Sequence, residues 1–181
     1  MTAGQPSASS VVYVSVSAEI TTPTTEGLIN VLANCANQGV QQVYLMISTQ
    51  GGNVMNGMNL YNVMRAMPYE LITHNVGNVD SVGIAVFLAG AKRYACPHST
   101  FMFHGVGLDC GAPTRLEEKL LTDTIASIQI EHGRIGSVMM DRTKLSDQQV
   151  KAFFREAQTK DAQFAQTVGI IDAIQEVRIA P

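Results

Sequence analysis

Short apolar runs, several of them rich in β-branched residues, recur along the chain and predict strands, because such runs are typical of a sheet covered by helices. They lie at Val11–Ser17, Val43–Ile47, Leu71–Val76 and Thr100–Phe103. Between and after them, apolar residues three or four positions apart predict helices. The predicted helices run from Pro23 to Gly39, from Gly52 to Pro68, over Ser81–Ala91, over Thr114–Met140, from the capping box Ser146–Gln149 onward, and over Asp161–Thr167.

This alternation of strands and helices predicts the domain organisation. A strand that is followed by a helix and then by another strand favours parallel pairing with crossover helices. We therefore expect an α/β layered fold with mainly parallel strands, formed by a single domain over residues 11–181. Residues 1–10 are small and polar and predict a flexible tail.

Composition excludes several classes of function. The chain has 181 residues, a net charge of −3 and no run of Lys or Arg, which argues against nucleic acid as a partner. The longest apolar run, Val82–Ala91, is about half the length that a bilayer span requires, so we expect no membrane partner. Cys35, Cys96 and Cys110 are odd in number and lack metal-ligand spacing, so we expect reduced thiols, no metal and no cofactor. With no secretory signal in the first ten residues, these features predict a cytoplasmic protein.

Two glycine-marked turns that join a strand to a helix are candidate sites of chemistry: Gly51-Gly52 and the segment Gly77-x-x-x-Ser81-x-Gly83. Ser81 follows the second of them and is placed for nucleophilic attack, although a serine at a helix start is most often a simple cap. The N–H of the next residue, Val82, could bind a developing oxyanion, and a second donor could come from Gly52 in the first turn.

His104 is the candidate base among the four histidines. It directly follows the predicted strand Thr100–Phe103 and precedes a glycine, which suits an imidazole presented at a sheet edge. By contrast, His132 falls near the apolar stripe of the long helix and is expected to be packed. His74 lies within a strand and His98 within a loop.

These segments, in this order and spacing, resemble the Clp protease proteolytic subunit, within the fold family shared with crotonases. Ile47-Ser-Thr-Gln-Gly-Gly-Asn-Val54 resembles the family segment Ile-Asn-Ser-Pro-Gly-Gly-x-Val, and Gly77-Asn-Val-Asp-Ser-Val-Gly83 resembles its nucleophile turn. The remaining matches are Gly57-Met-Asn-Leu-Tyr61, Leu88-Ala-Gly-Ala-Lys-Arg-Tyr94, Pro97-His-Ser-Thr-Phe-Met-Phe-His104 and Val168-Gly-Ile-Ile-Asp172. The resemblance covers roughly residues 20–172.

The resemblance implies a serine endopeptidase that degrades peptides or unfolded proteins through an acyl-enzyme. Ser81 would be the nucleophile, His104 the base, and Gly52 and Val82 the oxyanion donors. It also implies a homo-oligomeric ring and, as a further partner, an unfoldase ATPase. The short N-terminus lacks the axial-loop sequence of the family, which weakens the expectation of that last partner.

One position departs from the family pattern. Aligned without gaps from Arg142 to Gly169, the catalytic Asp of the family falls on Ala157. Glu156, Asp161 and Asp109 are the nearby carboxylates, and the third member of the triad could be any of these or none. Gln158, Thr159 or a backbone carbonyl could replace it in part.

Ala157 leaves other functions open. A catalytically impaired ring subunit with a structural or regulatory role keeps the scaffold but explains neither Ser81 nor His104. A crotonase-type acyl-CoA enzyme would use the same oxyanion donors, but no basic patch for CoA is evident. A Ser–Lys peptidase could use Lys92 or Lys119, but no membrane segment accompanies them.

Overall fold

The structure is a computed structural model that describes residues 11–107, 115 and 117–179. The strands are β1 (Val11–Ser17), β2 (Gln42–Thr49), β3 (Glu70–Asp80), β4 (Lys92–Ala95), β5 (Thr100–Phe103), β6 (Gln158–Asp161) and β7 (Ala173–Ile174). The helices are α1 (Thr22–Asn37), α2 (Val54–Ala66), α3 (Gly83–Phe87), α4 (Glu118–Arg142), α5 (Asp147–Glu156) and α6 (Ala162–Thr167).

All strands belong to one sheet. Its main path runs β1-β2-β3-β4-β7 with parallel neighbours, while β5 branches from the end of β3 and pairs with β6. The β3–β5 pairing is parallel and the β5–β6 pairing is antiparallel. The expectation of an α/β fold with mainly parallel strands is therefore confirmed.

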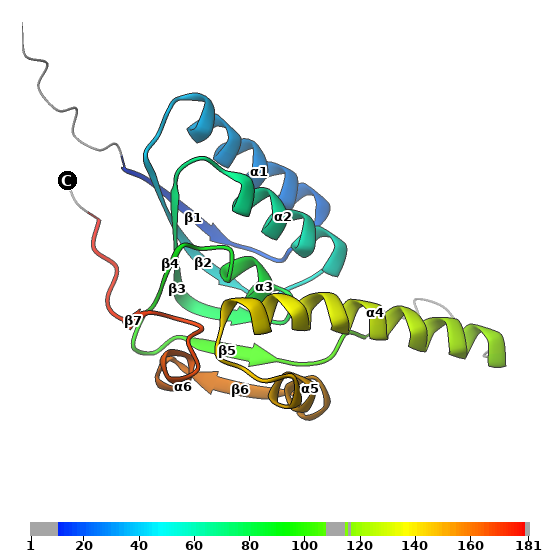
Figure 1. The fold of residues 1–181 in the computed structure, drawn as a ribbon. Helices are drawn as coiled ribbons and strands as arrows, with labels where there is room; N and C mark the ends of the chain where they lie inside the picture. The colour runs from blue at the N-terminus through cyan, green and yellow to red at the C-terminus, as the bar shows by residue number, and fades with distance from the viewer. Residues whose placement is uncertain (1–10, 108–114, 116, 180–181) are drawn as a thin grey trace, which may run out of the picture.

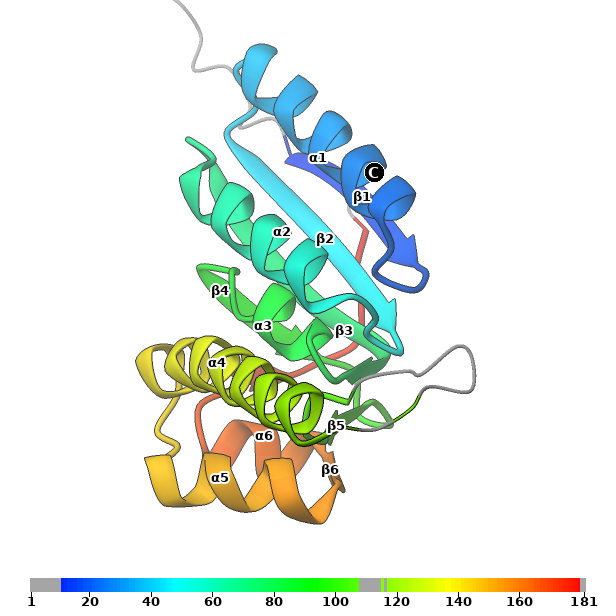
Figure 2. The ribbon, with the colours of Figure 1, turned by 90° about the vertical axis from the view of Figure 1, so that its right-hand side faces the viewer.

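Different elements cover the two faces of the sheet. Helices α1, α2 and α3 lie side by side on one face, whereas the C-terminal segment that follows β7 runs across the other (Figures 1 and 2). At one end of the sheet, α4 lies over α5, α6 and the β5–β6 ribbon (Figure 2). This end of the molecule brings the turn at Ser81, the strand before His104 and Ala157 into one region.

The core lies between the helical layer and the sheet. Leu32 of α1, Leu45 of β2 and Phe87 of α3 are each 0% exposed. Each fully buried side chain of this size contributes roughly 1.5–3 kcal/mol to folding. These apolar residues of the predicted elements thus lie on faces that the fold buries.

The observed elements differ from the predicted ones in three places. β3 continues through Gly77 to Asp80, so the glycine turn predicted there lies within a strand. The helix predicted to begin at Ser81 begins at Gly83, after a turn that contains Ser81 and Val82. β4, β6 and β7 have no predicted counterpart, because β4 begins with two charged residues, β6 is entirely polar and β7 has only two residues.

Helix α4 extends beyond the part of the protein that it packs on (Figure 1). Ile135 and Met139 of its predicted apolar stripe are buried, but Leu121 and Ile125 are exposed. Its N-terminal half projects from the sheet (Figure 1). The predicted first residue, Thr114, lies outside the described residues.

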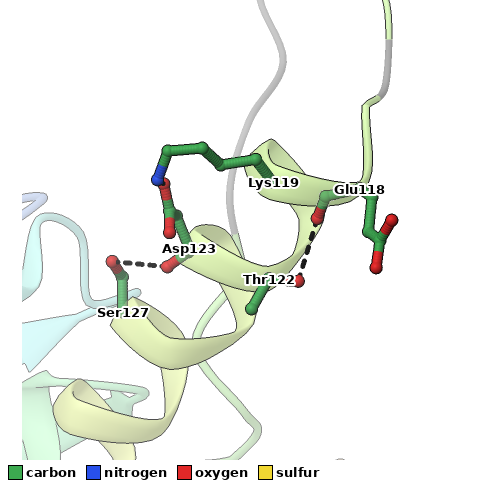
Figure 3. Close-up of polar contacts among 5 residues, drawn as sticks. All are labelled: Glu118, Lys119, Thr122, Asp123 and Ser127. Carbon is green, nitrogen blue, oxygen red and sulfur yellow. Dashed lines mark hydrogen bonds and ion pairs between the residues drawn. The ribbon is translucent and has the colours of Figure 1, made fainter.

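The polar side chains of the projecting half of α4 contact one another or their own backbone one turn away (Figure 3). Lys119 Nζ lies 2.8 Å from Asp123 Oδ2, and Thr122 Oγ1 donates to the Glu118 carbonyl. Ser127 Oγ donates to the Asp123 carbonyl one turn later. Among the helices of the described residues, α4 included, none is both long enough and apolar enough to cross a bilayer.

Candidate functional site

Ser81 has an unusual backbone conformation. It follows the last residue of β3 and has a φ of +58°, a left-handed value that is uncommon for residues other than glycine. Its N–H donates to the Met102 carbonyl of β5 at 2.8 Å. The turn is thereby fastened to the neighbouring strand, with the serine at its apex. Strained residues of this kind cluster at functional sites.

The Gly51–Gly52 turn packs directly against Ser81. A Cβ on Gly51 would lie 2.7 Å from Ser81 Cβ and 2.8 Å from the Asp80 carbonyl oxygen. The φ of Gly51 is +88° and that of Gly52 is +146°. Both positions need glycine, one because the nucleophile turn fills the space beside it and both because of their backbone conformation.

The two predicted oxyanion donors belong to the two turns that meet at Gly51 and Ser81. The Ile20 N–H donates to Gly51 O, and the Asn53 N–H donates to Ile20 O, at 2.7 and 2.9 Å. By the alternation of an extended chain, the polar groups of Gly52 point away from Ile20. Within the described part of the chain, the N–H groups of Gly52 and Val82 donate no hydrogen bond. Gly52 is exposed, so its N–H is accessible to an acceptor on a ligand, whereas Val82 is 0% exposed in this structure.

His104 lies close to the nucleophile turn. Asp80 of β3 pairs with Met102 of β5, and His104 comes two residues after Met102. Its Nδ1 forms a 2.7 Å hydrogen bond with the Gly105 carbonyl oxygen. Ser81 and His104, both described by the structure, do not hydrogen-bond to each other in it. The structure therefore brings the two predicted residues to adjacent strand ends without joining their side chains.

The third triad position occupies the neighbouring strand end. Phe103 of β5 pairs with Gln158 of β6, so the register carried one residue further sets Ala157 opposite His104. Ala157 ends α5 with a φ of +49°. The positions that the family pattern assigns to nucleophile, base and acid thus lie at the ends of β3, β5 and β6.

The alternative carboxylates are engaged elsewhere or undescribed. Asp161 pairs with Thr100 at the opposite end of β5, and its Oδ1 caps α6 by accepting the Phe164 N–H at 2.8 Å. Glu156 is exposed and accepts a hydrogen bond from Gln158 Nε2. Asp109 lies outside the described residues. Neither of the two described carboxylates bonds to His104.

A groove runs beside Gly52, one of the two predicted oxyanion donors. It has a volume of about 460 Å³ and lies between the segment Gly52–Met55 and the segment Val106–Gly107. Glu19 and Glu131 also line it. An extended peptide could enter between these two chain segments and pair with the free backbone groups of Gly52.

Two further residues beside His104, Gly105 and His132, make contacts that the sequence pattern does not predict. Gly105 has no space for a side chain, since a Cβ there would lie 2.8 Å from the Phe154 carbonyl oxygen. His132, expected only to be packed, stacks on Phe154 and also accepts the Val106 N–H. Both contacts cross between α4, α5 and the end of β5, so no local sequence signal reports them.

Comparison with known proteins covers nearly the whole chain. Residues 8–178 match the family model described as Clp protease. The ATP-dependent Clp protease proteolytic subunit 1 of Corynebacterium jeikeium is 35% identical over 83 residues, which are 42% of this chain and 44% of that protein. Subunit 2 of Corynebacterium efficiens is 26% identical over 154 residues, which are 80% of this chain and 71% of that protein.

A solved structure confirms the fold. A point mutant of ClpP1 from Listeria monocytogenes superposes with a TM-score of 0.81 at 21% sequence identity, over 92% of each chain. The expected ClpP/crotonase-like architecture is thus confirmed. Because the family model spans most of the sequence and the fold agrees with it, this chain belongs to the Clp protease family.

Proposed function

We propose that this chain is a serine endopeptidase that cleaves peptides or unfolded proteins within an oligomeric ring. The observation that carries the proposal is the conformation of Ser81, whose left-handed turn is held against Gly51 and bonded to β5 beside His104. A serine with only a structural role gains nothing from that strain.

The proposed reaction proceeds in two steps. Ser81 Oγ attacks the scissile carbonyl while His104 Nε2 takes the hydroxyl proton, and the N–H groups of Gly52 and Val82 bind the oxyanion. His104 then gives the proton to the leaving amine as the peptide C–N bond breaks. Water, deprotonated by His104, hydrolyses the acyl-enzyme and restores Ser81.

The hydrogen bond of His104 Nδ1 supports this assignment of roles. The Gly105 carbonyl can only accept a hydrogen bond, so His104 Nδ1 carries the proton and Nε2 keeps the lone pair that a base requires. The Ser81–His104 bond is absent from this structure, but such bonds often tighten only when substrate binds.

Turnover of an unstructured substrate tests the proposal. Purified protein should cleave fluorogenic peptides or unfolded casein, and Ser81→Ala and His104→Ala should each abolish cleavage while circular dichroism remains unchanged. Cleavage that survives in Ser81→Ala would refute the assignment of the nucleophile.

Ala157 supports a second candidate function, that of an impaired ring subunit. Without a carboxylate beside His104 the protonated imidazole is less stabilised, and loss of that acid from a working triad costs up to about 10⁴ in kcat. Subunits that assemble into rings but show no cleavage and no covalent modification at Ser81 would favour this role.

A further inference from the structure

We propose that the carbonyl of Gly105 replaces the missing carboxylate as the acceptor that orients His104, and that His132 is the positioning residue that holds this carbonyl. The inference rests on the proposed Ser81–His104 mechanism and explains how that mechanism operates with alanine at position 157.

A single peptide group links the two histidines. Its oxygen belongs to Gly105 and accepts from His104 Nδ1 at 2.7 Å, and its N–H belongs to Val106 and donates to His132 Nε2 at 2.8 Å. Because a peptide group is planar, fixing the direction of the N–H also fixes the direction of the carbonyl. The hydrogen bond that His132 accepts therefore aims the acceptor used by His104.

The same arrangement strengthens the acceptor. Hydrogen bonds in a chain polarise one another, so donation by the Val106 N–H increases the negative charge on the Gly105 oxygen. A neutral carbonyl stabilises an imidazolium less than a carboxylate does, but this polarisation recovers part of the difference. The chain from His104 through the peptide to His132 thus fixes both tautomer and orientation.

His132 is itself held in place by packing. Its ring stacks on Phe154 of α5, with centroids 4.6 Å apart and planes 14° apart. A Cβ on Gly105 would lie 3.0 Å from His132 Nε2, so the close approach of the turn requires glycine. Three elements, β5, α4 and α5, therefore meet at one peptide group.

The role requires His132 to be neutral, because an imidazolium has no lone pair to accept the Val106 N–H. Burial lowers the pKa of His132, which favours the neutral form. The charged groups near His132 come from two helices. On α5, Asp147, Lys151 and Arg155 line the same cavity as His132, which has a volume of about 490 Å³. On α4 itself, Glu131 is paired with Arg134. Asp147 and Lys151 also pair with each other, at 2.8 Å.

Rates of covalent modification of Ser81 by a fluorophosphonate test the inference. His132→Phe keeps a ring to stack on Phe154 but removes the acceptor. We expect the maximal rate of inactivation to fall about 10- to 100-fold, as when other orienting partners are lost, with no change in the concentration for half-maximal rate. His132→Gln, whose Oε1 reaches the position of Nε2, should recover most of the rate. His132→Asn is too short and should not.

A second experiment gives His104 an acceptor other than the Gly105 carbonyl. In an Ala157→Asp background the new carboxylate can accept from His104 Nδ1, so His132→Phe should cost much less there than in the natural chain. This coupling distinguishes orientation of His104 from a general structural role, which would cost the same in both backgrounds. If His132→Phe does not fold, comparison of His132→Gln with His132→Asn distinguishes orientation of His104 from a general structural role.

The outcomes separate the two proposals. Wild-type protein that forms no adduct at Ser81 overturns the proposed function and this inference with it. An adduct that depends on Ser81 but forms at the wild-type rate in folded His132→Phe, or in both His132→Gln and His132→Asn, overturns the inference alone.

Discussion

At the residue scale, left-handed backbone conformation marks the site. Among the described residues, Ser81 and Ala157 are the non-glycine residues with positive φ, at +58° and +49°. They occupy the two positions where the family pattern has its nucleophile and its acid. Both positions are thus left-handed in this chain, although position 157 carries no carboxylate.

Ala157→Asp should therefore increase activity at little cost in stability. Asp tolerates the left-handed region better than Ala does, so we expect the free energy of unfolding to change by no more than about 0.5 kcal/mol. The rate of peptide cleavage should rise at least about tenfold, below the ceiling of about 10⁴ set by loss of the acid from a full triad. Steady-state kinetics of the variant would show this, and Glu156→Ala beside it should have no effect on rate. An unchanged rate in Ala157→Asp would mean that residue 157 does not face His104.

Gly51→Ala should damage both stability and activity. The added Cβ would meet Ser81 Cβ at 2.7 Å in a backbone with φ of +88°, a strain that costs about 1–3 kcal/mol. Urea unfolding measures the loss, and fluorophosphonate labelling measures the displacement of Ser81. The matched control is Gly27→Ala in α1, where nothing lies within 4 Å of the new Cβ. That change should stabilise the protein by about 0.5–1 kcal/mol, and loss of stability in both variants alike would contradict the account.

At the element scale, the sequence predicts the elements with long repeating patterns and misses those set by tertiary contacts. The periodicities of α1 and α2 are visible because each helix buries one face, and β2 is visible as a continuous apolar run because both of its faces are buried. β6 has four residues, all of them polar, and forms because β5 offers it an edge. Ser81 could be singled out from glycine spacing and family resemblance, but the link between His104 and His132 joins residues 28 positions apart and has no sequence signature.

The projecting half of α4 gives a prediction about assembly. Leu121 is 46% exposed and Ile125 is 55% exposed, and they lie four residues apart on one helix face. Exposed apolar stripes mark interaction surfaces, and the proposed ring offers a second copy to cover this one. Ile125→Glu should reduce the mass measured by sedimentation velocity.

The control for that experiment lies one position away. Ala126→Glu adds the same charge at an exposed position turned by about 100° around the helix, and it should leave the assembly unchanged. Equal masses for Ile125→Glu and wild type would show that the stripe is not an interface.

At the scale of the whole molecule, the sheet face opposite the helices is closed by the C-terminal segment. His74 of β3 is 0% exposed and contacts Tyr44 through Nδ1. Its Nε2 lies 3.1 Å from the Gln175 carbonyl, which joins the last described residues to the sheet. Burial lowers the pKa of His74, and the Gln175 carbonyl and Glu176 oppose that shift.

This lowered pKa predicts that acid destabilises the fold. The unfolded chain binds a proton at position 74 below about pH 6.5, whereas the folded chain takes it up only at lower pH. Stability from this group is therefore present above about pH 6.5 and declines as pH falls through the window between the two pKa values. Urea unfolding at about pH 7.5, 6.5 and 5.5 should show the decline, and His74→Gln should flatten it. His98→Gln, at an exposed position, is the control, and a steep acid decline retained in His74→Gln would locate its cause elsewhere.

The most direct test of the account is the site of covalent modification by a fluorophosphonate. Peptide mass mapping of the labelled wild-type protein should place one adduct on Ser81, and the adduct should be missing from His104→Ala. An assembled, folded protein that stays unmodified, or that carries the label on another residue, would contradict a hydroxyl activated at the meeting point of β3 and β5.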